Sequence, residues 1–219
     1  MIKPLHARYG LALAALALAL GGCGRRALSL PTDPVDRAAT CGVVTAIAAR
    51  QAAGAAGKLP VAAQGRIFQF PLLAASQGPR FDSAIADATF KRMPQLFDRV
   101  SAQRWQAAVP ACAGAYPSTR ATKPAPLPTR PLDRALQCYM VADFMRKALG
   151  NQGGAYASAV QDYSGLAARI DAKLARLLPA AGIDGGEALQ RRRQRAMAAA
   201  AHLGPPTLVI AACQAHYPA

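Results

Sequence analysis

Apolar residues recur every three or four positions in the second half of the chain, which is the spacing of a helix with one buried face. The clearest stripe has basic residues along its polar side and comprises Tyr163, Leu166, Ile170, Leu174 and Leu177. A second stripe begins just after Pro131, a residue that suits a first helical position, and comprises Leu132, Leu136, Met140 and Phe144. Both segments are predicted to be helices that pack one face inward.

Two further helices are predicted downstream. Asp184 followed by Glu187 has the spacing of a capping box, and the helix that it would open runs to about Leu203, before the Gly-Pro-Pro sequence of residues 204–206. A fourth, short helix would hold Cys213. The second half is therefore predicted to contain about four helices.

The first half repeats this outline less regularly. Pro34 is a first-turn proline for a helix that continues towards Ala56. Residues 66–70 (Arg-Ile-Phe-Gln-Phe) are strand-like but have no obvious partner strand, so we expect an extended loop that covers the core. Pro94 is expected to break the chain between two later helices, which are predicted over residues 81–93 and 95–115.

The two halves resemble each other at both ends. Residues 34–41 (Pro-Val-Asp-Arg-Ala-Ala-Thr-Cys) and 131–138 (Pro-Leu-Asp-Arg-Ala-Leu-Gln-Cys) are identical at five of eight positions. The pattern Ala-Cys-x-x-x-Tyr-Pro occurs in residues 111–117 and again in residues 212–218. Both matches occur in the same order and enclose segments of similar length, which indicates an internal duplication. The predicted fold is all-α, with two tandem duplicated helical bundles of about four helices each.

The N-terminus has the pattern of an export signal. Lys3 and Arg8 precede an apolar run over residues 9–20, which is shorter than the ~20 residues that cross a bilayer. Residues 20–23 (Leu-Gly-Gly-Cys) then resemble the cleavage box of bacterial lipoproteins. The resemblance implies cleavage before Cys23, so that the mature protein would begin with an acylated cysteine.

The residue after this cysteine bears on the membrane. Gly24 stands where, in the family's sorting rule, aspartate marks retention at the inner membrane, so the resemblance implies an outer-membrane anchor with the protein facing the periplasm. The alternative is an ordinary secretory signal cut after residues 17–19 (Ala-Leu-Ala), which would leave a soluble periplasmic protein. The expected organisation is a signal peptide over 1–22, a lipidated cysteine and tether over 23–33, repeat 1 over 34–117, a proline-rich linker over 118–130 and repeat 2 over 131–218.

The other four cysteines are predicted to form two disulfides, because an exported domain lies in an oxidising compartment. The duplication favours Cys41–Cys112 and Cys138–Cys213, which would close each half by one bridge. The rival pairing joins equivalent cysteines of the two halves. The chain has no Cys-x-x-Cys pair, which argues against a zinc site and against covalent haem, so no metal and no cofactor are expected.

The chain carries a net charge of +15, and +13 remains after the predicted signal peptide is removed. The densest basic run comprises Arg191, Arg192, Arg193 and Arg195. On a helix this run wraps the surface rather than forming one stripe, so it is either a solvated face or a patch for polyanions such as lipopolysaccharide phosphates, phospholipid head groups or peptidoglycan-linked polymers. Nucleic acid is disfavoured, since aromatic residues make up only 6% of the chain and do not alternate with the basic run.

Candidate catalytic residues are scarce. Glu187, the only glutamate, is explained as part of the capping box, and His202 and His216 are placed near helix ends, where a cation favours the helix dipole. The chain lacks the short motifs of serine hydrolases, P-loop proteins and zinc proteases. The sequence thus predicts a lipid-anchored envelope protein that binds or scaffolds and is not an enzyme; the alternatives are an envelope enzyme acting on a glycan or lipid and an ordinary secreted helical protein. Its oligomeric state stays open.

Overall fold

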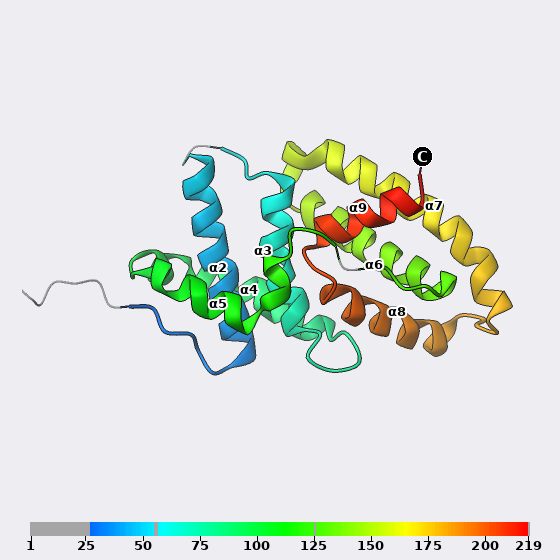
Figure 1. The fold of residues 1–219 in the computed structure, drawn as a ribbon, viewed down its shortest axis with the longest axis horizontal. Coiled ribbons are helices and arrows are strands. Elements are labelled where there is room, and N and C mark those ends of the chain that lie inside the picture. Colours follow the sequence, from blue (N-terminus) through cyan, green and yellow to red (C-terminus); the bar gives the residue numbers. More distant parts are fainter. Residues whose placement is uncertain (1–26, 55–56, 125, 219) are drawn as a thin grey trace, which may run out of the picture.

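The computed structural model describes residues 27–54, 57–124 and 126–218, and Cys23 with the predicted cleavage box lies outside them. The described residues are 76% helical and contain no strand (Figure 1). The first unit comprises α2 (Pro34–Ala53), α3 (Val61–Ala74), α4 (Ser83–Ser101) and α5 (Val109–Ala115), with the 3-10 turns η1 (Trp105–Ala108) and η2 (Pro117–Arg120). The second comprises α6 (Pro131–Gly150), α7 (Ala157–Ala180), α8 (Gly186–Ala201) and α9 (Pro206–His216), with η3 (Gly153–Tyr156).

Both units are built in the same way. The first helix of each, α2 or α6, packs against the other three helices of its unit. A disulfide then joins the first helix to the last, with Cα–Cα distances of 5.5 Å for Cys41–Cys112 and 5.7 Å for Cys138–Cys213. The predicted all-α fold of two disulfide-closed helical units and the predicted cysteine pairing are confirmed.

The first helix of each unit begins with the same side-chain anchor. Arg37 Nε donates a hydrogen bond to the carbonyl oxygen of Pro31 (2.9 Å), and Arg134 Nη1 donates to that of Pro128 (3.1 Å). These contacts extend the sequence repeat upstream, to a twelve-residue motif, Leu-Pro-Thr-x-Pro-x-Asp-Arg-Ala-x-x-Cys, that starts at Leu30 and Leu127. The backward hydrogen bonds hold these recurring segments, which the sequence suggested were only a tether and a linker, against the first turn of each helix.

The last helix of each unit also ends identically. Tyr116 N–H donates to the Cys112 carbonyl (2.9 Å), and Tyr217 N–H donates to the Cys213 carbonyl (2.8 Å). Both tyrosines leave helical geometry, with φ/ψ of −132°/67° and −122°/70°, because the following proline disfavours the helical region for the preceding residue. Both side chains are buried. The Tyr-Pro pair therefore ends the helix and packs its aromatic ring into the core.

The two units share one continuous core through α3. This helix packs against α2 and α4 on one side and against α8 and α9 on the other, so it lies between the units in Figure 1. Phe68 and Leu72 of α3 belong to the same buried cluster as Leu136 of α6. Gly65 permits the close approach, because a Cβ there would lie 2.7 Å from Thr207 Cγ2 of α9. The units are duplicated in sequence but fold as one packed body.

Three local predictions are wrong. Residues 66–70 lie inside α3 and not in an extended loop; with neighbours on both sides, α3 is apolar almost all round and shows no helical period. Helix α4 continues through Pro94 to Ser101, because Leu96 and Val100 beyond the proline are buried and tertiary packing outweighs the local disruption.

The third correction concerns the start of α8. Its N-cap is Gly185, which has no side-chain cap, so Asp184 and Glu187 do not form the expected capping box. Gly185 and Gly186 have φ of 103° and 59°, and this turn, at backbone angles that favour glycine, starts the helix one residue later than predicted. Glu187 instead forms an ion pair with Arg191 one turn along α8.

Candidate functional site

The predicted arginine patch on α8 is divided between two sides of the helix. Arg192 and Arg195 are exposed, whereas Arg191 and Arg193 are half-buried. Arg191 is paired with Glu187, and the guanidinium carbon of Arg193 lies 5.8 Å from the centre of the Tyr139 ring on α6. The four arginines do not form one face, as expected for a run that wraps a helix.

Arg193 contributes to a polar hollow between α6 and α8, which we call the α6–α8 basin. It has a volume of about 460 Å³ and is lined by Phe81, Ser83, Tyr139, Met140, Asp143, Arg146, Lys147, Gln190, Arg193, Gln194 and Met197. Three of these side chains are cationic and one is acidic, so the basin carries a net charge of +2. Sequence reasoning found only Arg193, since Arg146 and Lys147 lie some 45 residues away on another helix.

Asp143 organises the cations of the basin. Its carboxylate accepts a hydrogen bond from Arg146 Nη2 (2.5 Å) and lies 2.7 Å from Lys147 Nζ. Burial raises the pKa of Asp143, but the hydrogen bonds from Lys147 and Arg146 and their charges outweigh burial, and the pKa is lowered below its usual value. The carboxylate is therefore ionised and holds both cations at the mouth of the basin.

Arg193 is held differently. It stacks on Tyr139, and its Nε is buried without a hydrogen-bond partner in the part of the chain that the structure describes. A buried donor without a partner costs about 1–3 kcal/mol. Arg193 is thus held by its contact with Tyr139 and not by an ion pair with an acid of the described residues.

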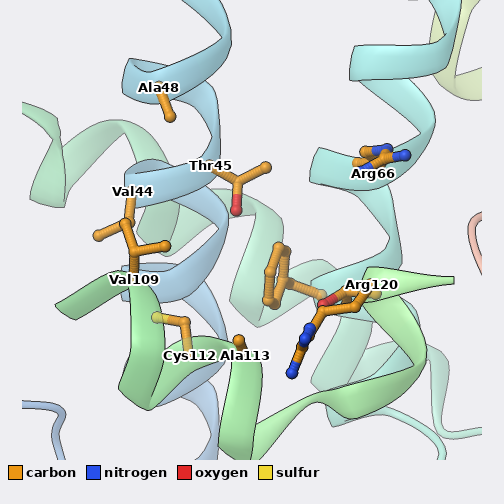
Figure 2. A pocket seen from close by; sticks show the side chains of 10 residues that line it. Val44, Thr45, Ala48, Arg66, Val109, Cys112, Ala113 and Arg120 are labelled. Atoms are coloured by element: carbon orange, nitrogen blue, oxygen red, sulfur yellow. The ribbon is translucent and has the colours of Figure 1, made fainter. Parts of the chain in front are cut away.

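A second hollow, the disulfide pocket, lies beside the Cys41–Cys112 bridge. It has a volume of about 240 Å³ and is lined by Val44, Thr45, Ala48, Arg66, Phe70, Val109, Cys112, Ala113, Thr119 and Arg120. In Figure 2 the α2 and α5 residues form facing walls, while Arg66 from α3 and Arg120 from the end of η2 close the remaining side. The pocket is apolar inside and basic at its rim.

The matching place in the second unit is filled. When the bridged cysteines are aligned, Ala48 corresponds to Met145, which is fully buried. Val109 likewise corresponds to Ile210, and the exposed fractions of these two side chains are 44% and 1%. The pocket is therefore specific to the first unit, where a smaller residue on α2 and an uncovered residue on α5 leave it open.

A third, aromatic hollow lies where the two units meet. Phe68 of α3, Phe90 of α4 and Phe144 of α6 pack with ring centres 5.7–6.3 Å apart. Two hollows, of about 540 and 430 Å³, are both lined by Phe68 and Phe90. Basic and acidic side chains both line the rims, including Arg50, Lys147, Asp87 and Asp98. The rims are thus of mixed charge and favour no ligand charge.

The residues considered for catalysis are dispersed. Glu187 lies on the exposed side of α8, and His202 ends that helix with Nε2 3.1 Å from the Ser76 carbonyl oxygen. His216 packs its ring edge-on against Tyr217. The described residues contain no cluster of three or more His, Cys, Asp or Glu side chains with the geometry of a metal site.

In residues 27–54, 57–124 and 126–218, no single helix is long and apolar enough to cross a bilayer. Helices α8 and α9 reach that length and composition only together, and they meet at a bend of 111°.

Comparison with known proteins finds no matching family model, no similar curated protein and no similar solved structure. The function must be argued from these hollows and from the sequence.

Proposed function

We propose that the protein is a lipid-anchored envelope protein that binds an anionic saccharide polymer without catalysing a reaction. The resemblance of residues 20–23 to a lipoprotein cleavage box supports an acyl anchor on Cys23, an outer-membrane location and a domain facing the periplasm. The two disulfides agree with an oxidising compartment. The α6–α8 basin is the observation that supports the ligand class.

The chemistry of the basin suits a phosphorylated or carboxylated sugar. Lys147, Arg146 and Arg193 line the basin and offer cationic donors. Gln190 and Gln194 add amide groups that both donate and accept hydrogen bonds, which suits the hydroxyl groups of a sugar. The single acid, Asp143, is already bound by two cations and does not repel an anion strongly.

The experiment measures binding of the full lipidated chain, held in neutral phosphatidylcholine discs, to immobilised lipopolysaccharide and to the same material without its phosphates. We expect salt-sensitive binding to the phosphorylated form only. The Lys147→Gln/Arg193→Gln variant should weaken it about tenfold, since two charge pairs at a partly exposed site contribute about 1.4 kcal/mol together. Arg99→Gln/Arg176→Gln, which removes two exposed charges elsewhere, is the matched control.

Three results would contradict the proposal. An equal loss in the control variant would mean that net charge and not the basin attracts the polymer. A loss in Arg192→Gln/Arg195→Gln without a loss in the basin variant would place binding on the exposed side of α8. Binding to phosphatidylglycerol vesicles but not to lipopolysaccharide would assign the basin to lipid head groups instead. The anchor is tested separately by incorporation of labelled palmitate, which Cys23→Ser should abolish.

A further inference from the structure

The interior of the disulfide pocket is suited to an apolar chain. Val44, Ala48, Phe70 and Val109 contribute hydrocarbon surface from three different helices. Of the two threonines in the lining, Thr119 already donates its hydroxyl to the Tyr116 carbonyl oxygen (2.7 Å). An apolar group that enters removes this surface from water and gains about 25 cal/mol per Å².

The rim of the same pocket is suited to an anion. Arg66 and Arg120 are both exposed, and neither forms an ion pair with an acid of the described chain. No aspartate or glutamate among the described residues lines the pocket. Arg66 from α3 and Arg120 from the end of η2 therefore both line the pocket without an acidic neighbour in its lining, on the side away from Val44 and Val109 (Figure 2).

The volume limits the size of the ligand. At about 240 Å³ the pocket is smaller than the ~300–1,000 Å³ of sites for drug-sized molecules, which leaves room for one chain and not for two side by side. We infer that the disulfide pocket binds an anion with a single linear acyl chain. The chain lies between α2, α3 and α5, and the carboxylate or phosphate head lies between Arg66 and Arg120. This site is separate from the α6–α8 basin and does not depend on it.

The second unit provides the structural control. There the counterpart of Ala48 is Met145, and the counterpart of Val109 is the buried Ile210, so the equivalent space is occupied by the protein itself. Replacing Ala48 by methionine should therefore fill the pocket with a side chain that the same helix position already accommodates in α6. The neighbouring charges stay in place in that variant, so it separates the pocket from its rim.

The test is photo-crosslinking of the full lipidated chain in neutral phosphatidylcholine discs. The probes are a diazirine-bearing dodecanoic acid, a lysophosphatidic acid with the same chain and the uncharged dodecanol analogue, and crosslinks are mapped by peptide mass spectrometry. We expect both anions to label the peptides of Val109 and Thr45. Labelling by only one anion identifies the head group as carboxylate or phosphate and supports the inference equally.

Two variants decide between outcomes. Ala48→Met should reduce labelling of these peptides by about tenfold or more, as expected when the apolar site is occupied. Arg66→Gln/Arg120→Gln, which changes two exposed side chains, should reduce labelling by the anions about fivefold and leave labelling by dodecanol unchanged. Arg99→Gln/Arg176→Gln is the control for net charge.

The inference is overturned if neither anion labels the pocket. It is also overturned if Ala48→Met and the arginine variant are both labelled as strongly as the unaltered protein. It is also overturned if dodecanol labels as strongly as the anions, because the rim would then have no role. None of these results bears on polymer binding, which is measured with variants of α6 and α8. The two proposals can therefore fail independently.

Discussion

Val109 on α5 is exposed, whereas Ile210, at the same place on α9, is buried, although both lie three residues before the cysteine that closes their unit. The difference follows from what covers each helix. Helix α9 is eleven residues long and packs against α3 of the other unit, while α5 has only seven residues and packs within its own unit. The two duplicated units are therefore closed by equivalent disulfides, but their last helices pack against different parts of the protein.

The ends of the two units diverged far less than their middles. The arginine anchor and the Tyr-Pro exit keep the same hydrogen bonds in both units. By contrast, α7 has 24 residues and its counterpart α3 has 14. The hydrogen bonds at the ends of the units thus recur, whereas the middle helices differ in length. The open pocket of the first unit reflects another local difference, a smaller residue on α2 and an uncovered residue on α5.

The largest effect is expected from the bridges. Cys41→Ala/Cys112→Ala and Cys138→Ala/Cys213→Ala open loops with separations of 71 and 75 residues, so the chain-entropy model predicts a loss of about 4 kcal/mol for each. That is a large part of a typical stability of ~5–15 kcal/mol. Urea unfolding of the two variants measures the losses. Strongly unequal values would show that local packing and not loop length sets the contribution of each bridge.

A smaller effect should separate the two closing helices. Ile210→Ala is expected to cost about 2–5 kcal/mol, because it leaves a cavity in the shared core. Val109→Ala should cost less than about 0.5 kcal/mol, because the side chain is already exposed. Thermal unfolding of both variants measures the difference, and Ile210→Val, at about 0.5–1.5 kcal/mol, is the graded control. Equal losses would mean that Val109 is covered in solution.

The sequence could predict features that are encoded locally or repeated. Pro34 and Pro131 mark the helix starts, and the matching cysteines were enough to choose the correct pairing. The helix α3 was missed because burial of most of its surface leaves too narrow a polar face to show a helical period. Part of the burial of α3 comes from α8 and α9, which lie far along the chain and cannot be read from the local sequence.

The candidate sites could be predicted only in small part. Arg193 was found as one member of a basic run, but its position over Tyr139 and beside Lys147 depends on how α8 packs on α6. Nothing in the sequence places Arg66 near Arg120, 54 residues later. One signal was available in the sequence. Ala48 and Met145 occupy equivalent positions when the two halves are aligned, and the smaller alanine indicates a space in the first unit that methionine fills in the second.

The smallest expected effect concerns one buried tyrosine in each unit. Burial raises the pKa of Tyr116 above its usual 10.0, and the nearby charge of Arg37 opposes this shift. Burial also raises the pKa of Tyr163, and there the negative charge of Asp162 acts in the same direction. Arg37→Gln should therefore raise the pKa of Tyr116 further, whereas Asp162→Asn should lower that of Tyr163. Absorbance titration of the phenolates measures both, with Tyr116→Phe and Tyr163→Phe to assign them.

The sign of the linked stability follows from these shifts. A raised pKa means that the folded protein favours the neutral phenol, so the stabilisation is complete below about pH 10 and is lost as the pH rises through the pKa of the folded state. Asp162→Asn should reduce the alkaline loss, because the folded pKa of Tyr163 then lies nearer its unfolded value. Arg37→Gln should increase that loss through Tyr116. If both variants changed the alkaline loss of stability in the same direction, the opposite charges beside the two tyrosines could not be the cause of that loss.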